Sequence, residues 1–235
     1  MKTAIVGDLH GRVEVVDAIL EKHDSIVFIG DYLDSFDRTK LDQLATIERV
    51  IKAHENSDTI TALQGNHERS YVGTNYNRCS GWNGITDMNI IDIKENIRSL
   101  PMYIWVDEFL VTHAGISKIF LNWVLREQKG SEGQSDRDLV DYYLANGTEG
   151  DGFDTVGITR GGHTICGGLL WCDWFQEFIP IDGIPQIVGH SGYRPLGQHI
   201  GILQKGNSYN IDCLDHVYEY LIVDGFSIQV EKLEV

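Results

Sequence analysis

Five short segments of this sequence place Asp, Asn or His next to glycine or alanine. The segments are Gly7-Asp8-Leu9-His10-Gly11, Gly30-Asp31-Tyr32-Leu33-Asp34, Gly65-Asn66-His67-Glu68, Thr112-His113-Ala114-Gly115 and Val188-Gly189-His190-Ser191. Each follows a short run that reads as a strand, and the run before Gly65 is more polar than the others. Open α/β sheets place their sites in loops at strand ends, so we expect the five segments to converge on one site.

The side chains collected in this way form a mixed oxygen and nitrogen ligand set without a thiolate. Its members are Asp8, His10, Asp31, Asn66, His113 and His190. Such a set suits two hard or borderline divalent ions better than a structural zinc. Asp31 is able to bridge two ions, and water held between them loses a proton near neutral pH. The predicted chemistry is therefore hydrolytic displacement at phosphorus.

His67 is next to a predicted ligand yet left over from the ligand count. The leaving alkoxide needs a proton, and we expect His67 to supply it, with Asp34 holding the imidazole in its protonated form. The remaining histidines lack a comparable context, and we interpret them as packed or surface residues. They are His23, His54, His163, His199 and His216.

Strands and helices alternate over the first half of the chain, which implies parallel strands joined by right-handed crossovers. We predict strands over 3–6, 25–29, 59–64, 103–106 and 109–112, and helices over 13–22, 41–53, 91–99 and 117–126. The last quarter reads as all-β, with strands over 186–188, 199–203, 209–211, 217–223 and 227–233. Residues 69–89 are too irregular for a prediction.

Residues 128–168 are rich in glycine and contain one short predicted helix, over 138–144. So much glycine near a site indicates a lid or substrate loop, and an insertion without a role is the alternative.

Composition limits the class of protein. A chain of 235 residues with 42% hydrophobic content can form one compact domain over residues 1–235. We find no apolar run of the roughly 20 residues that span a bilayer and no targeting sequence, which favours a cytoplasmic protein without a membrane partner. The four cysteines show no C-x-x-C spacing and are expected to be reduced. A net charge of -16 argues against long nucleic acids as partners. The oligomeric state is not predicted.

The five segments resemble the phosphoprotein phosphatase (PPP) family of calcineurin-like metallophosphoesterases, and in particular its bacterial and phage serine/threonine phosphatases. The family pattern GDxHG, GDxxDRG, GNHE, HGG or HAG, and GHT or GHS is matched in order across residues 7–191. Residues 169–173 resemble the family's LLWSD segment, and residues 209–213 resemble the strand after its last His. The resemblance implies an α/β fold, a four-layer α/β/β/α sandwich with a dimetal site at its rim.

The resemblance also implies a role for each matching residue. It assigns Asp8, His10 and Asp31 to the first metal, and Asp31, Asn66, His113 and His190 to the second. His67 and Asp34 become the general-acid pair. The family suggests Mn²⁺ most often, with Fe or Zn as alternatives that spacing alone does not distinguish.

The sequence departs from the family pattern at the phosphate clamp. The family places an Arg directly after the second Asp of GDxxDRG, whereas Ser35 follows Asp34 here. A guanidinium is the expected phosphate ligand. We name Arg160, Arg38 and Arg69 as the candidates.

Three functions are compatible with these features. The first is hydrolysis of phosphoserine and phosphothreonine in proteins, and of small aryl phosphates, by a hydroxide held between two metals. The second is hydrolysis of dinucleoside polyphosphates or nucleotides, with Trp82, Trp171 or Trp174 stacking on a base. The third is a non-catalytic metal-binding scaffold, which retention of both His67 and Asp34 disfavours.

Overall fold

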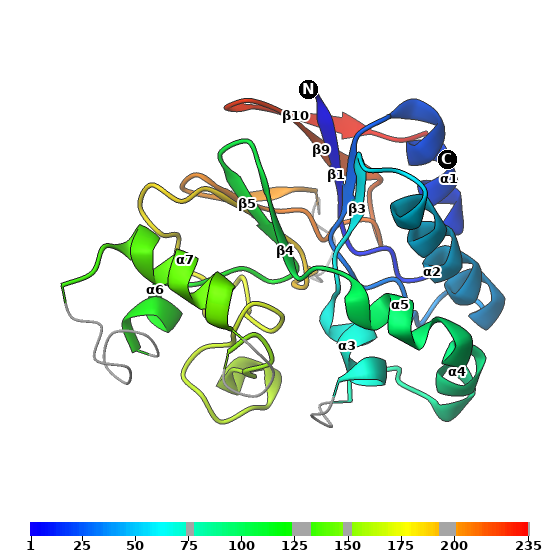
Figure 1. Cartoon of the computed structure of the whole chain (residues 1–235), viewed down its shortest axis with the longest axis horizontal. Coiled ribbons are helices and arrows are strands. Elements are labelled where there is room, and N and C mark those ends of the chain that lie inside the picture. The colour runs from blue at the N-terminus through cyan, green and yellow to red at the C-terminus, as the bar shows by residue number, and fades with distance from the viewer. Residues whose placement is uncertain (74–77, 124–132, 148–151, 193–200, 235) are drawn as a thin grey trace.

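A computed structural model of the protein describes residues 1–73, 78–123, 133–147, 152–192 and 201–234. Two five-stranded sheets stack between two groups of helices (Figure 1). The first sheet has the order β10-β9-β1-β2-β3 and the second has the order β4-β5-β6-β8-β7. The fold is therefore the predicted four-layer α/β/β/α sandwich.

The first sheet contains β1 (Thr3–Val6), β2 (Ile26–Phe28), β3 (Ile60–Ala62), β9 (Glu219–Asp224) and β10 (Ser227–Lys232). The second contains β4 (Tyr103–Val106), β5 (Phe109–Thr112), β6 (Gln186–Val188), β7 (Leu203–Lys205) and β8 (Ser208–Asn210). The helices are α1 (Val13–Lys22), α2 (Lys40–Glu55), α3 (Asn66–Val72), α4 (Gly84–Asn89), α5 (Lys94–Ser99), α6 (Lys118–Phe120) and α7 (Asp136–Asn146). Short 3₁₀ turns cover Ile91–Ile93 and Ile158–Arg160. No helix within the described ranges is long and apolar enough to cross a membrane.

Three apolar cores hold the layers together. Ile5 and Ile187 belong to the core between the two sheets. The neighbouring Val6 instead joins the core under α1 and α2, because successive strand side chains point to opposite faces. Tyr143 of α7 belongs to the third core, on the outer face of the second sheet. Strands buried on both faces read as continuous apolar runs, which is why the sequence predicted them well.

The parallel strands deliver polar residues to one edge of the sandwich. β1, β2 and β3 are parallel in the first sheet, and β5, β6 and β8 are parallel in the second. Polar residues follow these strands in chain order, namely Asp8 and His10, Asp31 and Asp34, Asn66 and His67, His113, His190, and Asp212.

Most predicted elements are present with small shifts of their ends. The main difference is that Asn66 and His67 begin a helix, α3, and that α4 follows within the stretch without a prediction. β7 covers Leu203–Lys205, whereas the prediction was a strand over 199–203, of which residues 199 and 200 lie outside the described ranges. The predicted helix over 117–126 is α-helical only over Lys118–Phe120, and its last residues lie outside the described ranges.

Glu68 joins α3 to the loop after β2. Its buried carboxylate accepts hydrogen bonds from the backbone N–H groups of Asp31 (2.8 Å), Tyr32 (2.8 Å), Leu33 (3.2 Å) and Gly65 (3.1 Å). A buried N–H group left unpaired is costly, so one carboxylate fixes two loops of the site.

We expect Glu68→Ala to lower the free energy of unfolding by about 3–5 kcal/mol, because it leaves several buried N–H groups without an acceptor. Glu68→Gln keeps one acceptor oxygen and should cost less, about 1–3 kcal/mol. Urea unfolding of both variants measures the difference, with Glu108→Ala on the exposed turn between β4 and β5 as the control. A Glu68→Ala protein as stable as the Glu108→Ala control would contradict this structural role.

Candidate dimetal active site

Asp31 lies between two groups of potential metal ligands. One group joins its carboxylate to His10 and His67, and the other joins it to His113 and His190. In each group the ligand atoms lie within 4.8 Å of one another. Asp31 Oδ2 is 3.7 Å from His10 Nε2, and Asp31 Oδ1 is 3.4 Å from His113 Nε2. A carboxylate shared in this way is able to bridge two ions.

Backbone carbonyls orient two of these imidazoles. His10 Nδ1 lies 2.8 Å from the carbonyl oxygen of Leu33, and His113 Nδ1 lies 3.1 Å from that of Ile29. A ring nitrogen that faces a carbonyl must carry the proton, so the lone pair of each ring is on Nε2 and points towards Asp31. Such outer contacts are typical of metal-ligating histidines.

The amide oxygen of Asn66 points into a group of hydrogen-bond acceptors. Asn66 Oδ1 is 2.7 Å from His113 Nε2 and 3.0 Å from His190 Nδ1, while Asn66 Nδ2 donates to Cys79 Sγ at 3.1 Å. Without a cation, the reversed amide would be favoured, because its nitrogen would donate to both rings and to Asp31. A cation among these lone pairs reverses that preference, so the observed orientation fits a metal site.

Two further buried atoms lack a partner among the described residues. Asp8 lies outside both groups, and one of its oxygens, Oδ2, accepts from His190 N–H at 2.9 Å. The other oxygen, Oδ1, and His190 Nε2 are buried without a hydrogen bond. Proteins rarely leave buried polar atoms unpaired, and a bound ion is one group that can satisfy them. The donor set of this site therefore fits divalent cations.

The backbone of the site is strained. His10, Asp31, Asp34 and His190 have positive φ angles of 41°, 54°, 61° and 68°. Asp107, in the exposed turn between β4 and β5, is the other non-glycine residue of this kind in the described chain. Residues rarely adopt this conformation unless the surrounding structure imposes it, and such residues gather at functional sites.

Burial keeps two of the histidines neutral. Burial lowers the pKa of His10, although the nearby Asp31 opposes the change. Burial, Arg160 and His113 lower the pKa of His190 well below its usual value. A neutral imidazole is the form that binds metal.

His67 has the opposite electrostatic setting. Its Nδ1 lies 2.9 Å from Asp34 Oδ2, and the other oxygen of Asp34 accepts from the hydroxyl of Tyr71 at 2.5 Å. Burial alone would lower the pKa of His67, but the carboxylates of Asp31 and Asp34 outweigh it and raise the pKa to about 9. Without bound cations, His67 is thus protonated at neutral pH and holds a proton on Nε2, 3.8 Å from Asp31 Oδ2.

Six of the site residues line an open cleft of about 1290 Å³, namely His10, Asp31, Asp34, Asn66, His67 and His190. The acidic residues in its lining are Asp31, Asp34, Asp37, Asp154, Asp212 and Asp215. Arg78 and Arg160 are the only Lys or Arg residues in the described lining. Cations or a phosphate bridged by cations would therefore be attracted to the floor of the cleft.

The profile of the family described as calcineurin-like phosphoesterase matches residues 1–191. The chain belongs to this family. It is accordingly a metal-dependent phosphoester hydrolase, and the family uses two metal ions. A comparison with curated proteins finds no match.

Solved structures with the same fold include other phosphoesterases. The cold-active protein-tyrosine phosphatase of a psychrophilic Shewanella species is 16% identical, with a TM-score of 0.58 over 97% of this chain and 80% of that chain. A metallophosphoesterase from Sphaerobacter thermophilus is also 16% identical, with a TM-score of 0.50 over 100% and 89% of the two chains. At these identities the likeness supports the fold alone.

Of the three arginines predicted to bind the phosphate, Arg160 is the one that lines the cleft of this phosphoesterase. Its Nη2 lies 2.9 Å from Asp173 Oδ2 and 2.9 Å from Ser191 Oγ, and it also donates to the carbonyl oxygen of His190 at 3.3 Å. All three contacts use Nη2, and no described residue accepts a hydrogen bond from Nε or Nη1. The guanidinium is therefore fixed beside His190 with donors left for a ligand.

Glu177 holds the loop that carries Arg160. Its carboxylate accepts from the N–H groups of Thr159 (3.2 Å), Gly167 (2.9 Å) and Asp173 (3.2 Å). Glycine at position 157 leaves room for this carboxylate, because a Cβ there would lie 2.2 Å from Glu177 Oε1 and would displace it from these N–H groups. Several residues of 154–164 line the cleft, so part of the glycine-rich 128–168 segment forms a wall of the site.

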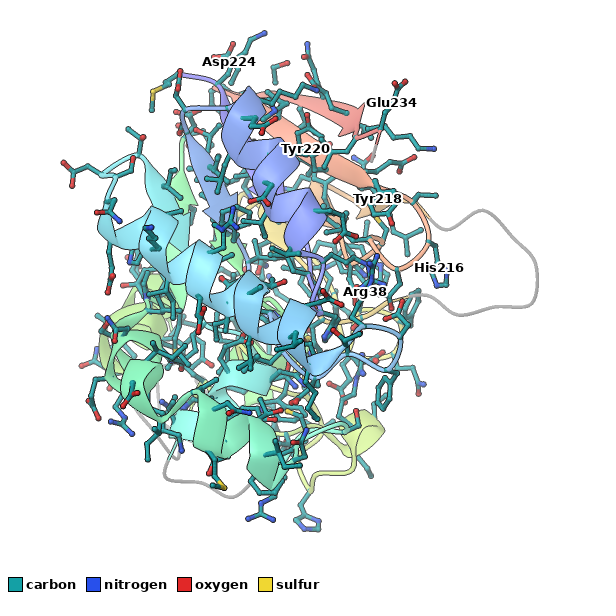
Figure 2. The ribbon with its side chains drawn as sticks, turned by 90° about the vertical axis from the view of Figure 1, so that its right-hand side faces the viewer. Arg38, His216, Tyr218, Tyr220, Asp224 and Glu234 are labelled. Carbon is teal, nitrogen blue, oxygen red and sulfur yellow. The ribbon has the colours of Figure 1, made fainter. Side chains whose placement is uncertain are left out.

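Arg38 and Arg69, the other two predicted clamp residues, lie outside the described lining of the cleft. Arg38 Nη2 pairs with Glu14 of α1 at 2.7 Å, and Figure 2 shows Arg38 on the side of the molecule that carries Tyr218. Arg69 is buried and its Nε pairs with Asp154 at 3.0 Å. Each guanidinium is committed to a carboxylate from another part of the chain.

Sequence reasoning gave no site role to several charged residues of the cleft lining, among them Arg78 and Asp212. Asp212 follows the strand-like run that ends in β8, so its position after a strand was a usable signal, although no glycine marks it. Burial and the neighbouring Asp215 raise the pKa of Asp212 to about 7. Arg78 lies in the stretch without a prediction and had no comparable signal.

Proposed function

We propose that this phosphoesterase is a phosphomonoesterase that hydrolyses phosphoserine and phosphothreonine in proteins. The observation that carries the proposal is the contact between His67 Nδ1 and Asp34 Oδ2, at 2.9 Å, in a histidine that also lies within the ligand cluster around Asp31. A non-catalytic metal scaffold has no need of a histidine held protonated beside its metal ligands. Removal of an alkoxide does need such an acid.

In this proposal the metal ligands are those that the resemblance implies. Asp8, His10 and Asp31 would hold one divalent ion, and Asp31, Asn66, His113 and His190 would hold the other. When bound, the ions supply positive charge for the phosphate and lower the pKa of water. We propose Mn²⁺ as the native metal, because the family suggests it most often; the mixed carboxylate, amide and imidazole set is equally compatible with Fe or Zn.

The protein residues divide the remaining tasks. Arg160 binds a phosphate oxygen and orients the ester. His67 donates the proton on Nε2 to the leaving oxygen, and Asp34 keeps that proton in place through Nδ1. Tyr71 fixes Asp34 from the other side.

The size of the cleft favours a protein substrate over a small molecule. Small-molecule sites usually occupy about 300–1,000 Å³, and this cleft is larger, at about 1290 Å³. Phe36, which is 73% exposed, lies in its lining and would contact apolar side chains of a peptide.

The tryptophans give little support to a nucleotide substrate. Trp174 is buried and stacks on Phe178, and Trp82 stacks on Tyr71. Trp171 is the one tryptophan of the described lining, where its ring meets the edge of His190. A single ring is a weak platform for a dinucleoside polyphosphate.

A substrate panel tests the proposal. With Mn²⁺ added, we expect phosphoserine and phosphothreonine peptides to be hydrolysed with kcat/KM at least about tenfold above that of nucleotides. Phosphotyrosine peptides belong in the panel, because one structural neighbour is named a protein-tyrosine phosphatase. Turnover of nucleotides or phosphotyrosine alone would reject the proposed substrate, and full metal loading without any hydrolysis would support the scaffold.

A further inference from the structure

The cleft contains a second guanidinium that no sequence motif indicated. Arg78 lines the cleft together with the following Cys79 and Ser80, and with Asp34 and His67. Arg160, in contrast, is fixed beside His190 and Ser191. Arg160 therefore lies beside a metal ligand, whereas Arg78 is linked through Trp82 and Tyr71 to Asp34 of the general-acid pair.

An aromatic platform supports Arg78. The central carbon of its guanidinium is 3.7 Å from the centre of the Trp82 ring. Trp82 in turn stacks on Tyr71, with ring centres 5.9 Å apart and planes at 24°. A planar guanidinium that lies on a ring keeps its N–H groups free around the edge, where they can bind two phosphate oxygens.

The backbone next to Arg78 is tied to the catalytic residues. Cys79 Sγ accepts from Asn66 Nδ2 at 3.1 Å and donates to the Asn66 carbonyl oxygen at 3.2 Å. Gly81 has a φ of +91°, and a Cβ there would lie 3.1 Å from both Cβ and the carbonyl oxygen of Asp34. The segment therefore packs directly against Asp34, the residue after which the family pattern places the arginine that is missing here.

Arg78 forms no ion pair with any described residue, although the cleft is acidic. Arg38 and Arg69, by comparison, are each paired with a carboxylate. Arg78 is exposed and its described contact is the face of Trp82. Its charge is thus available to an anionic ligand.

We propose that Arg78 replaces the arginine missing after Asp34 and binds the substrate phosphate opposite Arg160. The inference rests on the proposed phosphomonoesterase function and assigns one of its substrate contacts. Trp82 holds the guanidinium flat, and Tyr71 links this platform to Asp34. The phosphate is then held by one guanidinium on each side, in the cleft that His67 also lines.

The test compares Arg78→Ala and Arg78→Lys with Arg137→Ala in the full chain loaded with Mn²⁺. Arg137 is a matched control, because it is exposed and stacks on Trp105 at 4.2 Å but belongs to α7 and lies outside the cleft lining. The readouts are KM and kcat for p-nitrophenyl phosphate, inhibition by inorganic phosphate, and calorimetric binding of inorganic phosphate.

For Arg78→Ala we expect KM and the inhibition constant of phosphate to rise about 10- to 100-fold, the usual loss of a charge-assisted hydrogen bond, with a smaller effect on kcat. Arg78→Lys should recover little of this, because an ammonium lacks the planar fork. Trp82→Leu removes the platform and should give an intermediate rise. Arg137→Ala should match the wild type in every readout.

The outcomes separate this inference from the function on which it rests. A wild type that hydrolyses the ester, with Arg78→Ala unchanged in KM and in phosphate binding, overturns the role of Arg78 alone. Full recovery by Arg78→Lys overturns the bidentate contact. A wild type that hydrolyses no monoester overturns the proposed function, and weaker calorimetric phosphate binding by Arg78→Ala would still support the anion site.

Discussion

Replacement of Asp31 by Asn is expected to remove both metal ions and to lower kcat/KM by more than about 100-fold. Loss of a residue that only contacts a metal ligand usually costs about 10- to 100-fold, and Asp31 is itself a predicted ligand of both ions. Asp31 is the residue shared by the two ligand groups. An amide has no negative charge and a single acceptor oxygen, so it is a poor bridge between two cations. Both ions should therefore be affected by this one substitution.

The substitution is chosen to leave the backbone intact. Asp31 has a φ of 54°, and Asn is among the few residues that tolerate this conformation. A loss of metal would then reflect the carboxylate rather than a collapsed loop. Circular dichroism of the metal-free proteins checks that the fold is kept.

Metal content and thermal melting measure the effect. Mn²⁺ at 100 times its dissociation constant adds about 2.7 kcal/mol to stability, which for a chain of this size corresponds to a rise of roughly 5–10 °C in Tm. We expect that rise in the wild type and in Asp182→Asn, a fully exposed surface carboxylate, and not in Asp31→Asn. An Asp31→Asn protein that retains two ions per chain would contradict the bridging role.

The ligand cluster was predictable because its residues follow strands. Runs such as residues 3–6 and 109–112 are buried on both sides and are therefore continuously apolar, so their ends are visible in the sequence. Parallel pairing then places the loops at one edge. Little more than strand order is needed to bring Asp8 near His190, although 182 residues separate them.

Helix α3 was not predictable, because it depends on a contact with residues that are distant in the sequence. It has only seven residues, Asn66–Val72, and short helices are marginal without tertiary support. Its support comes from Glu68, which binds backbone N–H groups of the loop after β2, more than 30 residues away. Nothing in the local spacing of residues 65–72 indicates this contact.

The arginines show the same limit more clearly. Arg38 and Arg69 lie near motifs in the sequence, but their side chains are long and pair with Glu14 and Asp154. Arg78 is far from any motif and reaches the cleft because Cys79 and Gly81 pack on Asn66 and Asp34. Tertiary ion pairs determine which guanidinium is available to bind the substrate. These pairs join residues that are distant in the sequence, so the local spacing of a motif does not predict them.

Replacement of His67 by Asn is the second large effect that we expect, and it separates two roles for this residue. His67 Nε2 lies in one of the ligand groups, and a contact from Nδ1 to a carboxylate is also typical of metal-ligating histidines. As a ligand, His67 would be needed to hold the metal. As the general acid, it would be needed for the leaving group only.

The acid role predicts a loss that depends on the substrate. We expect His67→Asn to lower kcat about 10²- to 10⁴-fold for phosphoserine and phosphothreonine peptides, whose alkoxide leaving groups need a proton. The loss should be much smaller for p-nitrophenyl phosphate, because its leaving group is a stable anion. Metal content should equal that of the wild type, and loss of an ion in this variant would assign His67 to the metal instead.

The pH profile gives an independent check of the same role. The carboxylates of Asp31 and Asp34 raise the pKa of His67 to about 9, whereas bound cations act in the opposite direction. Because the protonated form is the active acid, peptide hydrolysis should fall as the pH rises through the pKa of the loaded enzyme. Asp34→Asn removes a charge that favours the imidazolium, so its basic limb should move to lower pH, and His67→Asn should lack that limb. A basic limb that persists unchanged in His67→Asn would mean that another group titrates, and His67 would then not be the acid.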